Sequence, residues 1–186
     1  MNALDNTATS NDNTAIGSFA LRDTTAANNV AVGKSALILN TSATDNTAVG
    51  TYAGDALTTG GNNTLVGYHA AGNSTTAANV TALGWKALEA NTTGVCTGVG
   101  SQALWSNTTG NNNTAVGISA MLVNTADNNT CVGHNSMAAN TTGTQNVAMG
   151  GFALDANSSG SYHTAFGYHA LGVNTTGDNN TAFGWS

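Results

Sequence analysis

Charged side chains are scarce in this chain. Only 6% of its 186 residues are charged, against about 25% in typical soluble proteins. The net charge is −6, and the only cations are Arg22, Lys34 and Lys86. Because so few cations are present, the chain lacks the electrostatic basis for binding nucleic acid or an anionic membrane surface. We therefore expect neither as a partner.

Long apolar runs and proline are absent as well. No apolar run approaches the roughly 20 residues that a membrane-spanning helix needs, so membrane insertion is not expected. The first residues, Met1 to Asp5, have neither the basic nor the apolar region of a secretory signal. Disorder is not expected either, because disordered chains combine high net charge with few β-branched residues, whereas Thr and Val are abundant here.

The few chemically reactive residues are dispersed. The two cysteines, Cys96 and Cys131, lie far apart in the chain and are not expected to form a disulfide. The four histidines do not converge as metal ligands must. No paired carboxylates, Ser/His/Asp set or phosphate-binding loop stands out. We therefore expect no enzymatic activity, no cofactor and no metal site.

What the sequence does contain is a repeat. One glycine recurs at a spacing of 16 or 17 residues. The repeat glycines are Gly17, Gly33, Gly50, Gly67, Gly84, Gly100, Gly117, Gly133, Gly150, Gly167 and Gly184. The consensus unit reads N-T-A-V-G-x-x-A-L-x-x-N-T-T-G-x-N. A unit this short buries no core alone, so stacked copies are expected to share one.

Each residue position before the glycine forms a column through the stack. The residue directly before it is large and apolar in every copy, and we predict that this valine column is the buried core. Its members are Ile16, Val32, Val49, Val66, Leu83, Val99, Val116, Val132, Met149, Phe166 and Phe183. The alanine column lies two before the glycine, and the threonine column, of Thr or Val, lies three before it. The alternation predicts a short strand whose small face approaches either another chain or the facing wall of the same coil.

The residues of the second half of the unit do not settle its secondary structure. Ala stands three after the glycine in every full copy but one, where Ser136 takes its place, and mostly Leu or Met stands four after it, as in Leu37, Leu88 and Met121. This segment reads as a second short strand or as a helical turn. The prediction is an all-β parallel β-solenoid of eleven coils of about 17 residues. It forms one domain over residues 1–186 without a linker.

The strand motif resembles known fibre repeats. Asn13 to Gly17, Asn46 to Gly50 and Asn113 to Gly117 are similar to the repeats of bacteriophage tail-fibre proteins and of the heads of trimeric autotransporter adhesins. The likeness covers essentially the whole chain. It implies a fibre located outside the cell or on a virion surface, carries no catalytic residues, and makes a trimeric shaft involved in host attachment the alternative function.

The aromatic residues and the threonine column suggest two further binding roles for the surface. The aromatic residues Tyr52, Tyr68, Trp85 and Tyr168 follow the repeat glycines, where they either pack together or bind a host-surface glycan. The threonine column could order water as in ice-binding solenoids, although Val30 and Val147 interrupt it. Ice or glycan binding is the third function considered.

The two chain ends carry complementary parts of the unit. Ala3 and Leu4 match the Ala-Leu segment, while the last residues, Thr181 to Ser186, match its strand and turn. We therefore expect a self-assembling structural subunit that stacks head to tail with copies of itself. The expected assembly seam consists of Ala3, Leu4, Ile16, Thr181, Ala182, Phe183 and Trp185. In this seam Phe183 would be buried against Leu4 and Ile16, and the filament would be extracellular.

Overall fold

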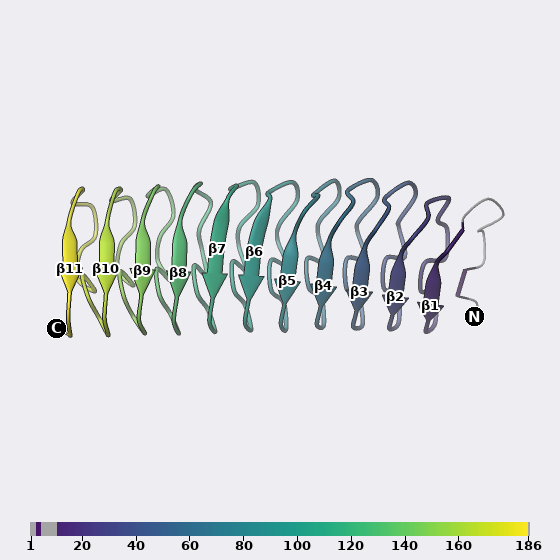
Figure 1. Ribbon diagram of the computed structural model, residues 1–186, viewed down its shortest axis with the longest axis horizontal. Helices are drawn as coiled ribbons and strands as arrows, with labels where there is room; N and C mark the ends of the chain where they lie inside the picture. Colours follow the sequence, from purple (N-terminus) through teal and green to yellow (C-terminus); the bar gives the residue numbers. More distant parts are fainter. Residues whose placement is uncertain (1–2, 5–10, 186) are drawn as a thin grey trace.

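The computed structural model describes residues 3–4 and 11–185 and confirms the predicted solenoid. Eleven short strands lie side by side along a rod, one in each coil (Figure 1). They are β1 (Thr14–Ile16), β2 (Val30–Val32), β3 (Thr47–Val49), β4 (Thr64–Val66), β5 (Thr81–Leu83), β6 (Cys96–Val99), β7 (Asn113–Val116), β8 (Thr130–Val132), β9 (Val147–Met149), β10 (Thr164–Phe166) and β11 (Thr181–Phe183). At about 4.8 Å per strand, the rod is roughly 50 Å long.

The strands form one parallel sheet in chain order. Each pairs with its neighbours without a slip, so that every column of the repeat is also a column in space. Thr14 lies opposite Val30 and Ala15 opposite Ala31, and the same register continues to Ala165 opposite Ala182. Because each position of the repeat faces the same position in the next coil, the sequence repeat becomes a set of parallel side-chain rows.

The repeat glycines end the strands in the way the sequence predicts. All eleven have a φ angle between 127° and 142°, a region that residues with a Cβ atom rarely adopt. At Gly84 a Cβ atom would also lie 2.5 Å from the carbonyl oxygen of Gly100 in the next coil. Glycine is thus required here both by the backbone turn and by the close approach of two coils.

The Ala-Leu segment is neither of the two structures considered for it. After each strand the chain runs through consecutive turns, and the residues two and four after the glycine are left-handed, as in Lys86 (φ 55°) and Leu88 (φ 53°). Lys86 N–H donates to the Tyr68 carbonyl of the preceding coil, and Leu88 N–H donates to the Ala103 carbonyl of the following coil. Alternating handedness therefore lets this segment bond to both neighbouring coils. No helix of the described residues is long and apolar enough to cross a membrane.

Candidate functional site

The valine column lies on the outside of the rod, which corrects the predicted core. In β2 to β10 the residue of the alanine column is buried and the residues directly on either side of it are partly or fully exposed. Exposure is 61% at Ile16, 36% at Val49, 38% at Val66, 37% at Val132, 39% at Met149 and 73% at Phe183. Val32, Leu83, Val99, Val116 and Phe166 are likewise only partly buried. The prediction failed because alternation separates two faces without saying which one turns inward.

The interior is lined instead by the alanine column and by the leucine column, four residues after each glycine. Ala31, Ala48, Ala115 and Leu88 are fully buried. A Cβ atom on Gly98 of the alanine column would lie 3.2 Å from Leu88 Cδ1, so the two columns face each other across one coil. The small residues therefore approach the facing wall of the same coil, and they no longer favour contact with another chain or a trimer.

Two buried asparagine columns, which were not predicted from the sequence, complete the interior. One stands four residues before the glycine and one seven after it, and Asn46, Asn63, Asn107 and Asn140 are examples. The Asn46 side-chain oxygen accepts hydrogen bonds from the Asn63 backbone N–H (3.0 Å) and from Asn63 Nδ2 (2.9 Å). The recurrence of Asn at two fixed positions was the available signal, since buried amides must be hydrogen-bonded and a ladder achieves this.

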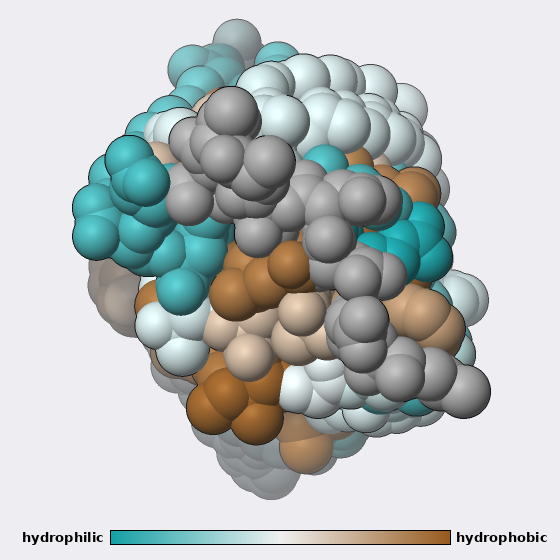
Figure 2. Space-filling view, turned by 90° about the vertical axis from the view of Figure 1, so that its right-hand side faces the viewer, coloured by the Kyte–Doolittle hydropathy of each residue, from teal (hydrophilic) through white to brown (hydrophobic). Residues whose placement is uncertain are grey.

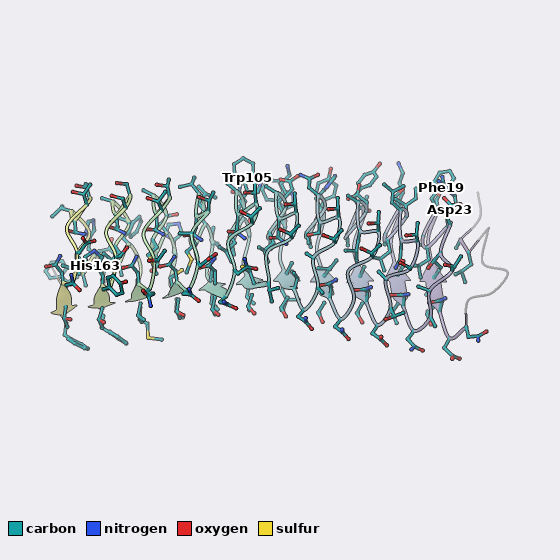
Figure 3. All side chains as sticks on the ribbon, turned by 90° about the horizontal axis from the view of Figure 1, so that it is seen from above. Phe19, Asp23, Trp105 and His163 are labelled. Carbon is teal, nitrogen blue, oxygen red and sulfur yellow. The ribbon has the colours of Figure 1, made fainter. Side chains whose placement is uncertain are left out.

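Cysteine and histidine fit into these same rows. Cys131 takes an alanine position in the alanine column, where it is fully buried, and burial raises the pKa of its thiol to about 12. Cys131 and Cys96 are both free. His163 occupies an asparagine position inside the rod (Figure 3), where its Nδ1 accepts a hydrogen bond from the Asn180 N–H at 3.2 Å. The described residues contain no group of three potential metal ligands that could hold an ion.

The predicted aromatic residues form separate clusters. The Tyr52 and Tyr68 rings meet edge to face at 6.2 Å, and both pack against His69. Trp85 lies beneath the Lys86 ammonium at 5.2 Å. Tyr168 is several coils away, with its ring 5.7 Å from that of Phe152. These contacts fit the packing interpretation, while glycan binding stays a prediction.

A small charged cluster lies beside the first aromatic cluster. His69 Nδ1 is 3.9 Å from Asp55 Oδ1 and 4.0 Å from Glu89 Oε1. Burial raises the pKa of Asp55, although the nearby His69 opposes this. Burial also acts to raise the pKa of Glu89, but hydrogen bonds from Trp105 and Lys86 outweigh it and lower that pKa. The cluster thus brings together side chains from three successive coils of the rod.

The outer sheet face and the two ends of the rod expose apolar side chains, for example Val66, Ile16 and Phe183. We define the outer sheet face as the threonine and valine columns together. The strand side chains project on one side of the rod, whereas Trp105 and Phe19 lie on the other (Figure 3). The N-terminal end, seen in Figure 2, shows apolar residues between polar ones. These surfaces are the candidate functional sites.

The predicted seam residues lie at the two ends. Ala3 and Leu4 pack on the core, and Leu4 N–H donates to the Ala20 carbonyl at 3.2 Å. This bond has the same form as the one from Leu21 N–H to Ala36, so Leu4 continues the leucine column. At the other end Thr181 and Phe183 are exposed, Ala182 is half-buried and Trp185 is 80% exposed. The part of the unit expected over residues 5–10 lies outside the described residues.

Comparisons with protein-family models, with curated proteins and with solved structures found no match to this chain.

Proposed function

We propose that the chain is a structural subunit that stacks end to end with copies of itself into a filament. The observation that supports it best is the incomplete burial of both end coils. Ala15 and Ala182 are half-buried, while Ala31 and Ala165 in the next coils are fully buried. Each end of the sheet has unpaired backbone N–H and C=O groups beside exposed apolar side chains, so a further strand can pair with it.

The two ends are alike enough to pair. A second copy can place Thr14 opposite Thr181, Ala15 opposite Ala182 and Ile16 opposite Phe183, which repeats the register of every internal strand pair. No charged side chain lies in either strand. Such a contact joins unlike surfaces and does not close on itself when stacking is near-linear, so it propagates into a fibre.

The joint differs from the one expected from sequence. Phe183 and Ile16 point outward, so they would stack on the outer sheet face rather than enter the core. Exposure there would fall from 61% at Ile16 and 73% at Phe183 toward the 36–39% of interior members such as Val49 and Met149. The buried part of the joint would be Ala15 against Ala182, with Leu4 above Leu171.

The test is assembly of the intact chain and of two matched variants. Ala182→Arg places a charge on the inner side of the joint, whereas Ile118→Arg adds the same charge at a 56% exposed side chain in the middle of the rod, far from both ends. In negative-stain micrographs and sedimentation velocity, we expect wild type and Ile118→Arg to form filaments with a subunit repeat of about 50 Å. Ala182→Arg should stay a folded monomer.

The proposal would be overturned if the wild-type protein sedimented as one small species at high concentration without filaments. It would also be overturned if Ala182→Arg polymerised as readily as wild type. Circular dichroism separates loss of assembly from loss of folding.

A further inference from the structure

We propose that the outer sheet face binds ice. The face consists of two rows, the threonine column and the valine column, which stand on the same side of a regular parallel sheet. Their shared orientation follows from the burial of the alanine column between them. This inference is independent of filament formation, although end-to-end stacking would lengthen the face.

The hydroxyl groups of the threonine column are free to bind water. In the part of the chain that the structure describes, Thr47, Thr64, Thr81 and the other threonines of this column have no hydroxyl hydrogen bond to the protein. A second threonine column, eight residues after the glycine, behaves differently. There Thr41, Thr92 and others donate their hydroxyl to the carbonyl oxygen of the next coil at 2.8–3.0 Å.

The two threonine columns are therefore not equivalent. The second column uses its hydroxyls to tie neighbouring coils together, and those groups have one bond fewer to offer to solvent. The outer sheet face keeps both donor and acceptor capacity of each hydroxyl for water. Between the hydroxyls, the methyl groups of Thr and the side chains of the valine column offer apolar surface, around which water orders into cages.

The outer sheet face carries no charged side chain. No charged residue occurs in the threonine or the valine column. Most charged residues of the interior coils lie in the turns after the strands, for example Lys34, Asp55, Lys86, Glu89 and Asp155, while Asp45 and Asp127 stand just before β3 and β8 at the border of the face. A charged group would hold its own hydration shell and disturb a water lattice, so a lattice of neutral water molecules is the occupant to which this surface is complementary.

The side chains of the outer sheet face are evenly spaced both from strand to strand and along each strand. Neighbouring strands are about 4.8 Å apart, and residues two apart in a strand are about 6.6 Å apart. Together the two repeats arrange the hydroxyl and apolar side chains of the face as a regular two-dimensional grid, the kind of surface that a crystal lattice can contact. The constant strand register and the close-packed glycine turns hold the rows in fixed positions. The side chains of the face therefore lose little conformational entropy on binding.

A few residues interrupt the regular rows of the outer sheet face. Val30 and Val147 keep the branched shape of threonine but lack the hydroxyl. Larger side chains, Met149, Phe166 and Phe183, stand in the valine column near the C-terminal end. The most regular stretch therefore runs from β3 to β8, and we expect ice contact to be centred there.

The experiment measures thermal hysteresis and the partition of the protein into slowly growing ice. Thr114→Lys places a charge on the outer sheet face, and Thr125→Lys makes the same substitution in the second threonine column. We expect wild type to separate the freezing and melting points, to facet ice crystals and to enter the ice. Thr125→Lys should retain this activity, and Thr114→Lys should lose most of it.

A second variant on the same face, Thr64→Lys, should lose activity in the same way, so the outcome does not depend on one site. Circular dichroism and sedimentation establish that all variants share the fold and assembly state of wild type. Exclusion of wild type from ice, with no hysteresis, would overturn the proposal. Equal loss of activity in Thr114→Lys and Thr125→Lys would overturn it too, as would Thr114→Lys blocking self-association while leaving ice partition intact.

Discussion

Side-chain size is matched across single coils of the rod. The coil that begins at Gly50 has Gly54 in the leucine column, where most other coils have Leu or Met, and it alone has Leu in the alanine column, at Leu65. A Cβ atom at Gly54 would lie 2.6 Å from Leu65 Cδ1. The large and small residues have exchanged places, and the volume inside the coil is conserved, as close-packed interiors require.

This exchange predicts a compensating pair of substitutions. Leu65→Ala alone should lower the free energy of unfolding by about 2–5 kcal/mol, because it leaves a cavity. Adding Gly54→Leu restores the arrangement of the other coils, and its left-handed backbone (φ 58°) matches that of Leu37 and Leu88. Urea unfolding followed by circular dichroism should show recovery of most of the loss. Additive or worse destabilisation in the double variant would contradict internal contact between these positions.

At the scale of the element, the turn after each strand exists only because coils are stacked. Left-handed residues other than glycine cost roughly 1–2 kcal/mol each. Here the cost is offset by backbone bonds to both neighbouring coils, such as those of Lys86 and Leu88. An isolated unit has neither partner, so local propensity alone could not indicate this conformation.

Two glycines differ in whether their position requires glycine. Gly84→Ala should destabilise the rod by more than about 1 kcal/mol, since the φ of 140° is unsuited to alanine and the added Cβ meets Gly100. At Gly151 a Cβ atom would have only ordinary contacts, the nearest at 3.5 Å. Gly151→Ala should be neutral or stabilising by a few tenths of a kcal/mol. Thermal melts of the two variants compare them directly, and equal melting temperatures would refute the assigned role of the repeat glycine.

At the scale of the whole molecule, the rod is a one-dimensional stack in which each coil contacts only its neighbours. Stability is then approximately a sum of coil and interface contributions. The same change should cost more where a coil has neighbours on both sides and its polar groups are fully enclosed. The asparagine ladder offers a position at which this can be measured.

Asn140 and Asn174 occupy the same column at different depths. Asn140 is fully buried, donates to Asn124 and Gly143 and accepts from Asn157. Asn174 lies in the last full coil and is only partly buried. Asn140→Ala should cost about 1–3 kcal/mol for each buried partner left unsatisfied, and Asn174→Ala distinctly less. Chemical unfolding would measure both, and similar losses would argue against additive nearest-neighbour stability.

The sequence alone determined the architecture. A glycine at every 16 or 17 residues, with fixed neighbours, requires equivalent units, and units this small must stack to bury a core. The glycine turns and the small size of the alanine column, including Cys131, also followed from the residue types. The extracellular or virion location, the self-association and the surface activities remain predictions.

Only the tertiary structure decided which face of the strand turns inward. Alternation in Thr114-Ala115-Val116 distinguishes two faces, and hydropathy favours burying Val116, yet Ala115 is the buried residue. The reason is the width of the coil: leucine side chains arriving from the turn fill the interior, and only small residues fit opposite them. The left-handed turn and the two asparagine ladders depend on the same fact, because their hydrogen-bond partners belong to neighbouring coils and exist only once the coils are stacked.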